Sequence, residues 1–355
     1  MLSYQKMLQG CGEWCRTSGP ENDVVISSRV RLARNLAAYP FMSQTNESDR
    51  TAIQTRVQTA LQTLRPEEMT LFELEKFSLQ QRMMLVERHL ISGDLALGEG
   101  SRSVAISEDE SLSVMICEED HLRIQSLVSG FDLSRAWDIA SSLESQLAER
   151  LSFAVSEEFG YLTACPSNVG TAMRVSVMLH LPALQWTSQM GRVIRGLQKV
   201  HLTMRGLYGE NSQAQGDLFQ ISNRVSLGKT EAELLALLND VVPDIVEYER
   251  KARSFFAAEE KNSFTERIDR ALGMLTDTEA VSTEEAMNLL STLRVGTILG
   301  VVKDFPLSTI DRLFQFTQSA HLQQWLGSEL EPTECSIERA RYLREHLLWK
   351  KKSSI

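Results

Sequence analysis

The stretch from residue 103 to residue 127 reads SVAISEDESLSVMICEEDHLRIQSL. Apolar and polar residues alternate in two runs, 103–107 and 112–118, and four polar residues at 108–111 separate them. This pattern predicts a β-hairpin, because successive side chains of a strand point to opposite faces of a sheet. A third strand is expected over 122–127. The second strand delivers an acidic run, CEEDHLR at 117–123, to its end.

The acidic run needs a cationic partner. Glu118, Glu119 and Asp120 are adjacent, and crowded carboxylates repel one another unless a positive charge lies close by. An isolated triplet of this kind is usually a solvated turn. Here Arg123 closes the run, and arginine-containing motifs recur through the first two-thirds of the chain. These are SSRVRLARN at 27–35, CPSNVGTAMR at 165–174 and RGLYGE at 205–210.

The arginines have the spacing of a polyphosphate site. Arg29 and Arg31 are two residues apart on an expected strand, so both side chains face the same way and can grip one anion. The chain contains neither GxxxxGK[ST] nor a GxGxxG that opens a helix after a strand. The nucleotide-binding loops of P-loop proteins and protein kinases are therefore excluded. A nucleotide held by arginines is the kinase design that remains.

Composition restricts the class of protein further. A formal net charge of -10 over 355 residues argues against nucleic acid as the main partner and leaves room for basic protein substrates. Five scattered cysteines are typical of reduced thiols in a cytosol. The first 20 residues lack a long apolar run, so we expect neither a signal peptide nor a membrane anchor. The expectation is a soluble cytoplasmic protein without a metal site of its own.

The chain divides into three segments by the character of its patterns. A short lead covers 1–23, a mixed region of strands and helices covers 24–258, and a helical region covers 259–355. Thr230 with Glu233 predicts the start of a long helix as a capping box. In the helical region we expect helix starts at Ser282 with Glu285, at Ser308 with Asp311, and at Ser336.

Two glutamates fit a positively charged phosphoryl acceptor. A guanidinium has a pKa above about 12 and cannot attack phosphorus while it is protonated. One carboxylate must therefore orient it and accept its proton, and a second must fix the angle of attack. We expect Glu119 and Glu210 to be this pair. Phosphoryl transfer needs little more than alignment, magnesium and cations around the moving group.

Five motifs in one order resemble the phosphagen (guanidino) kinase family over residues 24–252. They are SSRVRLARN, CEEDHLR, CPSNVGTAMR, RGLYGE and FQISNRVSLGKTE. The chain looks most like the bacterial protein-arginine kinase branch, which lacks the small N-terminal helical domain of other members and has a C-terminal helical domain instead. The resemblance implies an α+β fold: an antiparallel sheet flanked by helices, followed by a small all-α domain.

The resemblance also implies roles for individual residues. Glu119 would be the catalytic base and Glu210 its partner, while Glu118, Cys165 and Asn168 would lie near the substrate. ATP would enter with Mg²⁺ held mainly by the nucleotide. The residues implied to bind ATP are Ser27, Ser28, Arg29, Val30, Arg31, His89, Arg123, Arg174, Val175, Ser176, Val177, Met178, Arg205, Gly206, Leu207, Tyr208, Gly209 and Glu210.

One motif of the branch is altered in this chain. The branch carries an RDxxRA sequence that binds phosphoarginine in its C-terminal domain, and the corresponding stretch here is CSIERA at 335–340. Arg339 and Ala340 are what remains of that site. Because the first arginine is missing, a bidentate phosphate contact is lost. We therefore expect a weak response to phosphoarginine, with the helical domain serving mainly to form a homodimer and contact clients. The alternative is that Arg339 with neighbouring Arg341 or Arg344 still forms the pocket, since arginines on one helix turn can substitute for one another in space.

Three functions are compatible with these motifs. The first is an ATP-dependent kinase of arginine side chains in proteins, which the resemblance links to the activator McsA, the ClpC protease, the CtsR repressor and the stress response. The second is a kinase of free arginine or another small guanidino compound. The third is a protease adaptor that keeps the fold only as a scaffold. Both glutamates and all the arginines are retained, which favours a catalyst over an adaptor.

Overall fold

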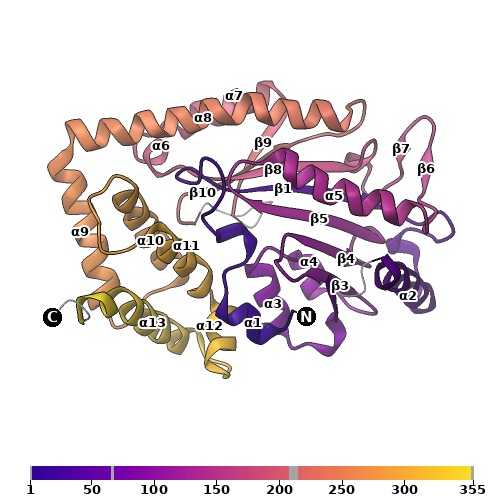
Figure 1. Cartoon of the computed structure of the whole chain (residues 1–355), viewed down its shortest axis with the longest axis horizontal. Helices are drawn as coiled ribbons and strands as arrows, with labels where there is room; N and C mark the ends of the chain where they lie inside the picture. Colours follow the sequence, from indigo (N-terminus) through magenta and orange to yellow (C-terminus); the bar gives the residue numbers. More distant parts are fainter. Residues whose placement is uncertain (1, 65–67, 208–214, 353–355) are drawn as a thin grey trace.

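A computed structural model describes residues 2–64, 68–207 and 215–352 of the chain. Its centre is an antiparallel sheet with the strand order β2-β3-β4-β5-β1-β8-β10-β9 (Figure 1). The strands of this sheet are β1 (Val25–Arg34), β2 (Met69–Glu73), β3 (Ser103–Ser107), β4 (Leu112–Ile116), β5 (Leu122–Ser129), β8 (Met173–His180), β9 (Leu202–Gly206) and β10 (Leu218–Asn223). A separate small hairpin joins β6 (Val155–Ser156) to β7 (Gly160–Tyr161).

Helices surround the sheet, and all the regular elements that the structure describes beyond β10 are helices. The first seven are α1 (Tyr4–Gln9), α2 (Glu47–Leu64), α3 (Leu79–Glu87), α4 (Gly93–Leu97), α5 (Leu133–Ala148), α6 (Pro182–Trp186) and α7 (Met190–Lys199). The others are α8 (Glu231–Glu259), α9 (Lys261–Asp277), α10 (Thr283–Ile298), α11 (Leu307–Phe316), α12 (Ser319–Leu326) and α13 (Pro332–Lys352). The antiparallel sheet with its flanking helices confirms the α+β expectation.

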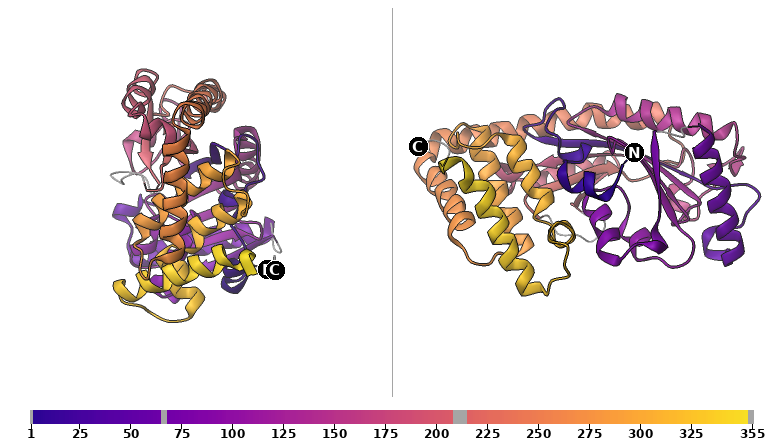
Figure 2. Two further views of the ribbon diagram at one scale, coloured as in Figure 1. Left: turned by 90° about the vertical axis from the view of Figure 1, so that its left-hand side faces the viewer. Right: turned by 60° about the horizontal axis from the view of Figure 1, so that its bottom comes forward.

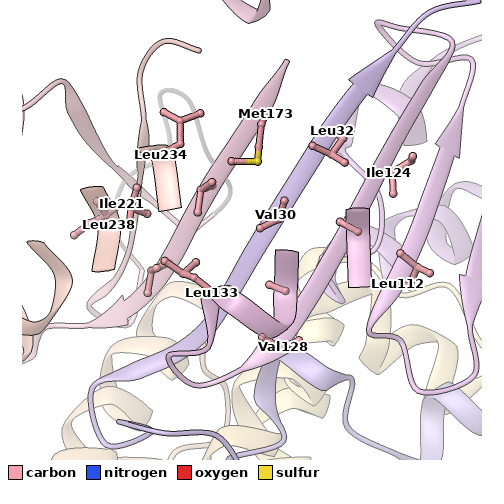
Figure 3. Packing of buried hydrophobic residues seen from close by; sticks show 14 of the residues in the cluster. Val30, Leu32, Leu112, Ile124, Val128, Leu133, Met173, Ile221, Leu234 and Leu238 are labelled. Atoms are coloured by element: carbon pink, nitrogen blue, oxygen red, sulfur yellow. The ribbon is translucent and has the colours of Figure 1, made fainter. Parts of the chain in front are cut away.

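The main hydrophobic core lies between one face of the sheet and the helices α5 and α8. Val30 and Leu32 of β1 point into it, as does Ile124 of the neighbouring β5 (Figure 3). Leu133 and Leu238 reach the same core from the two helices. Because side chains alternate along a strand, burial of Val30 and Leu32 sends Arg29 and Arg31 to the opposite face.

The N-terminal lead and the C-terminal helices pack beside that opposite face (Figure 2). A second cluster of buried residues combines Trp14 of the lead and Met178 of β8 with Leu290 and Phe314 of the C-terminal helices. Arg294 of α10 is fully buried and donates from Nη1 and Nη2 to the carbonyl oxygens of residues 23 and 22, at 2.8 and 2.7 Å. The helical region therefore shares a core with the sheet.

The hairpin, one capping box and one N-cap follow the sequence patterns. Ser103–Ser107 pairs with Leu112–Ile116, and Thr230 caps α8 with both bonds of a capping box. Ser282 caps α10. None of the described helices combines the length and apolarity that a membrane-spanning segment needs.

Two predicted helix starts are wrong. α11 begins at Leu307 after Pro306, so Ser308 is already helical, and Asp311 is buried in an ion pair with Arg294 (2.7 Å). Ser336 lies inside α13, which begins at Pro332, and its hydroxyl donates to the carbonyl of residue 332 at 2.9 Å. Pro306 is the N-cap of α11, and Pro332 is the first residue of α13, where its fixed φ suits the first turn. In both cases the helix begins at or directly after a proline rather than after the predicted serine.

Candidate active site

The arginine-bearing face of the sheet forms the wall of a cavity of about 1230 Å³. The cavity brings together motifs that are far apart in the sequence. Among the predicted site residues, those that line it are Arg29, Arg31, His89, Glu118, Glu119, Arg123, Cys165, Asn168, Arg174, Arg205 and Leu207. The sheet order explains this convergence, because β5, β1, β8, β10 and β9 are successive neighbours.

The arginines on this face form a dense cluster of positive charge. Arg31 of β1 lies directly opposite Arg174 of β8. Burial, with Arg174 and Arg123 nearby, lowers the pKa of Arg29 to about 10, and burial with Arg29 nearby puts the pKa of Arg31 well below its usual range. The buried Nε of Arg31 has no hydrogen-bond partner in the described part of the chain. Such crowding of cations favours a polyanionic ligand, which would relieve the repulsion.

Polar residues of β8 and β10 hold two of these arginines in place. Arg29 donates to the side-chain oxygen of Gln220 and, from Nε, to the Ser176 hydroxyl at 3.3 Å. Arg174 donates from Nε and Nη2 to the Ser222 hydroxyl at 3.3 and 3.2 Å. The guanidinium groups are therefore oriented before a ligand binds, which reduces the entropy cost of binding.

Arg123 holds both glutamates of the acidic run. Its Nη1 lies 2.7 Å from the Glu118 carboxylate, and its Nη2 lies 3.1 Å from Glu119 Oε2. Glu118 is buried and also accepts a hydrogen bond from Ser92, whereas the Glu119 side chain is 44% exposed. Glu118 is thus fixed by its partners, and Glu119 remains accessible to a substrate.

Glu119 has the electrostatic setting of a proton acceptor. Partial burial raises the pKa of its carboxyl, Arg123 opposes this rise, and the negative charges of Asp120 and Glu118 add to it. A carboxylate with a raised pKa binds a proton more readily, which suits a general base. The arrangement can therefore take a proton from a cation that enters the cavity.

A tight, strained turn positions the acidic residues 118–120 at the end of β4. Cys117 adopts φ +60°, a conformation that side chains other than glycine rarely occupy, and its N–H donates to the carbonyl of His121 at 3.0 Å. Asp120 Oδ1 accepts from Asn35 Nδ2 (2.6 Å) and from the Ala164 N–H (2.7 Å). The third acid of the run is thus structural: it ties the turn to the end of β1 and to the loop that carries Cys165.

Cys165 and Asn168 reach the cavity from the loop before β8. Cys165 Sγ lies 3.0 Å from the Ser167 hydroxyl, and the Ser226 hydroxyl donates to the carbonyl of Asn168 at 3.0 Å. Because Asp120 binds the Ala164 N–H, this loop and Glu119 belong to one hydrogen-bonded unit. The predicted substrate-proximal residues therefore share one region of the cavity with the predicted base.

His89 lies in the cavity wall just beyond the end of α3. The Trp14 ring packs edge-on against it, with 4.7 Å between ring centroids, and its carbonyl accepts from Gln125 Nε2 at 2.7 Å. Burial, with Arg29 nearby, lowers the pKa of His89 to about 3. The imidazole is therefore neutral near pH 7 and offers a ring rather than a charge to a ligand.

The remaining predicted residues fall into three groups. Val30, Val175 and Val177 are fully buried in the main core, and the Ser28 hydroxyl donates to the carbonyl of Gly130 at 2.9 Å. These side chains point away from the cavity, as strand alternation requires. Ser27, Ser176 and Met178 are buried on the arginine-bearing face, and Gly206 ends β9. Tyr208, Gly209 and Glu210 lie outside the described residues, so their roles stay predictions.

Sequence reasoning missed the polar residues that support the arginines. Gln220 and Ser222 sit two apart on β10, as Arg29 and Arg31 do on β1, so the same alternation in FQISN could have identified them. Ser92 could not have been found in this way. It is the N-cap of α4, and only the fold brings it to Glu118.

Arg339 of α13 is committed to backbone and side-chain contacts within the helical region. It is buried, and it donates from Nε to the carbonyl of Thr317 (2.7 Å) and from Nη1 to the carbonyl of Val281 (2.8 Å). Its Nη2 donates to the Ser319 hydroxyl at 3.0 Å, and Ala340 is fully buried beside it. Arg339 thus joins α13 to the start of α12 and to the residue before the N-cap of α10.

Comparison with known proteins assigns the chain to a family. The protein-family model described as ATP:guanido phosphotransferase, C-terminal catalytic domain, matches residues 52–252. The family model of the protein-arginine kinase McsB C-terminal domain matches residues 261–354. The chain belongs to the ATP:guanido phosphotransferase family. It is accordingly an enzyme, a kinase that uses ATP.

Relatives within this family align along nearly the whole chain. The protein-arginine kinase of Symbiobacterium thermophilum is 43% identical over 338 residues, which cover 94% of this chain and 96% of the relative. The protein-arginine kinases of Halothermothrix orenii and Bacillus pumilus are 40% and 39% identical, covering 94% and 98% of this chain and 96% of each relative. The similarity therefore includes the helical region as well as the sheet.

Two solved kinase structures share the fold. The duplicated taurocyamine kinase from Schistosoma mansoni, solved with transition state analog components, matches with a TM-score of 0.61 and 29% identity over 69% of this chain and 35% of that chain. A lombricine kinase matches with a TM-score of 0.58 and 24% identity over 68% of this chain and 70% of its own.

Proposed function

We propose that this chain transfers the γ-phosphoryl group of ATP to arginine side chains of proteins. The observation that carries the proposal is the pairing, in one cavity, of a cluster of arginines with an accessible glutamate whose pKa is raised. The first feature suits a polyphosphate and the second suits a guanidinium. The names of the relatives, all protein-arginine kinases, support a protein-bound acceptor.

The residues of the cavity divide the chemistry between them. Arg29, Arg31 and Arg174 would hold the phosphates and offset the charge on the moving phosphoryl group. Mg²⁺ would enter with the nucleotide, held mainly by it, and would supply further positive charge against the phosphates. Glu119 would accept a guanidinium proton as the nitrogen–phosphorus bond forms and the bond from phosphorus to the bridging oxygen breaks, releasing ADP. Glu210 remains the proposed second carboxylate.

Further parts of the proposal concern the setting of the enzyme. We place it in the cytoplasm as a homodimer whose phosphoarginine marks direct proteins to a Clp-type protease under stress, with McsA, ClpC and CtsR as partners. We also propose that residues 24–258 form the catalytic domain and 259–355 the helical domain. The two adjacent family-model matches, which end at 252 and begin at 261, support this division.

A kinase of free arginine is the second candidate. A comparison of rates with the two kinds of acceptor separates it from a protein-arginine kinase. Initial rates of ADP formation would be measured with an unfolded, arginine-rich protein and with free arginine at matched concentrations of guanidino groups. The proposal predicts turnover of the protein at concentrations where free arginine gives none. Equal rates for both would favour a small-molecule kinase, and no ADP formation with either would favour the adaptor.

A further inference from the structure

The tripeptide Glu87-Arg88-His89 joins the cavity to the C-terminal helical region. Glu87 is the last residue of α3 and Arg88 is its C-cap, and both Glu87 and His89 lie in the cavity wall. The two residues before His89 make their main contacts with other parts of the chain that lie far away in the sequence. Both are buried charged groups, and their partners lie in the lead, in the β3–β4 turn and in α12.

Glu87 caps the first turn of α12 with both of its carboxylate oxygens. Oε1 accepts from the N–H of Ala320 and Oε2 from the N–H of His321, each at 2.8 Å. The imidazole of His321 adds a third bond, from Nδ1 to Oε2 at 2.9 Å. The N–H groups of a first turn lack partners within the helix, so a buried carboxylate that satisfies two of them is a strong tie.

Arg88, the next residue, holds the end of α3 to the β3–β4 turn and to the N-terminal lead. It is buried, pairs with the Glu110 carboxylate through Nε (2.8 Å) and Nη2 (2.6 Å), and donates from Nη1 to the carbonyl of Met7 at 2.9 Å. Its Nη1 also lies 3.3 Å from Nε2 of His321. His321 thus donates to Glu87 through Nδ1 and accepts from Arg88 through Nε2, as a single neutral tautomer allows.

The ring of His89 is held by the lead, which the helical region holds in turn. Trp14 packs edge-on against the imidazole, and the next residue, Cys15, donates from Sγ to Gln315 Oε1 of α11 at 3.1 Å. His89 itself adopts φ +58°, a conformation that needs support from its surroundings. Both the backbone and the ring of His89 therefore depend on contacts to α11 and α12.

We propose that Glu87 is a positioning residue for nucleotide binding: by capping α12 it sets the place of His89 in the wall of the ATP site. The inference rests on the proposed function, which puts ATP in this cavity. His89 is neutral, so it would contact the base or ribose, while the sheet arginines hold the phosphates. The C-terminal helices are thereby part of the nucleotide site, although they supply little of its lining.

The test compares Glu87→Ala with a matched control, Glu249→Ala. Glu249 is also buried and caps another helix in the same way, accepting from the N–H groups of Ala183 (3.1 Å) and Leu184 (3.0 Å) at the start of α6. Both variants lose the same kind of contact, so both should lose thermal stability. By calorimetry, Glu87→Ala should bind ATP about tenfold more weakly, the equivalent of one lost hydrogen bond. Glu249→Ala should bind ATP within about twofold of wild type.

Two further arms distinguish positioning from general loosening. Inorganic tripolyphosphate should bind Glu87→Ala within about twofold of wild type, because the arginine cluster is unchanged. In a His89→Ala background, Glu87→Ala should cause no further loss of ATP affinity, since the effect acts through His89. If Glu87→Ala does not fold, Glu87→Gln takes its place, because it keeps one acceptor oxygen. Its ATP affinity should then fall about threefold, with tripolyphosphate binding unchanged.

Several outcomes would overturn the inference. Unchanged ATP affinity in Glu87→Ala or Glu87→Gln, an equal loss in Glu249→Ala, or a loss that adds to that of His89→Ala would each do so. Failure of the proposed function gives a different result. In that case wild-type protein would not bind ATP at all. ATP binding by His89→Ala as tight as that of wild type would instead overturn the inference and leave the proposed function standing.

Discussion

At the scale of single residues, Glu119 and Arg123 carry most of the chemical argument. Their side chains are 3.1 Å apart, yet Glu119 remains 44% exposed, so it can exchange Arg123 for an incoming guanidinium. We predict that Glu119→Gln lowers the rate of phosphoryl transfer by about 100- to 10,000-fold, because the proton acceptor is lost. Its affinity for ATP should stay nearly the same. Single-turnover kinetics and calorimetry would measure the two quantities.

The control for this substitution is Glu108→Gln. Glu108 is an exposed turn residue of the same hairpin, paired with Lys6 at 2.7 Å. Its rate should match that of the wild type. Turnover of Glu119→Gln within threefold of wild type would remove Glu119 from the mechanism.

The raised pKa of Glu119 predicts a specific pH dependence. A general base works only when deprotonated, so transfer should fail as the pH falls through the pKa of Glu119. Because burial and neighbouring acids raise that pKa, the acid limb of kcat/KM should lie above the ordinary glutamate value of about 4.3. Initial rates of ADP release across the acid range would locate the limb. An acid limb at or below the ordinary value would contradict the assignment.

The arginines of the sheet should act mainly on nucleotide affinity. Arg29→Ala or Arg174→Ala removes a charge-assisted hydrogen bond of roughly 1.5–3 kcal/mol, so ATP should bind at least about tenfold more weakly and transfer should slow. Arg195→Ala on the exposed face of α7 is the control, because it removes the same charge from the surface. Unchanged ATP affinity and rate in both site variants would count against the arginine cluster as the phosphate site.

At the scale of elements, the altered motif on α13 predicts a changed regulatory response. Cys335 and Ser336 stand where the branch has arginine and aspartate, and Arg339 already binds the carbonyls of Thr317 and Val281. Free phosphoarginine should therefore show no saturable binding outside the active site. It should also give no clear stimulation of phosphoryl transfer. Titration with phosphoarginine, followed by calorimetry and activity, would test this. Clear stimulation that Arg339→Ala abolishes would refute it.

The elements also show which signals in the sequence determine structure. The hairpin of β3 and β4 was predictable because period-two alternation and a polar turn coincide there. The starts of α11 and α13 were not, because a proline overrode serine residues that resemble caps. Phe314 and Leu322 of the helical region are buried, whereas Trp325 is 46% exposed and packs its ring against Tyr342.

At the scale of the whole molecule, the limits of sequence reasoning are contacts over long distances in the chain. Resemblance to a family and strand alternation together located Arg29, Glu119 and Arg174 in one cavity. No local pattern shows that Glu87 caps a helix more than two hundred residues away or that Arg294 binds the lead. These contacts form only once the sheet has brought both ends of the chain together. The helical region could therefore be predicted as helices, but its contacts with the residues behind the site could not.

The most direct test of the account is to look for the proposed product. The wild-type protein would be incubated with ATP, Mg²⁺ and an unfolded arginine-rich protein, and the peptides analysed by mass spectrometry under non-acidic conditions. The account predicts acid-labile phosphate on arginine side chains, dependent on ATP and absent with Glu119→Gln. Phosphate found only on free arginine, or no phosphoarginine at all while ATP binds normally, would contradict the central claim.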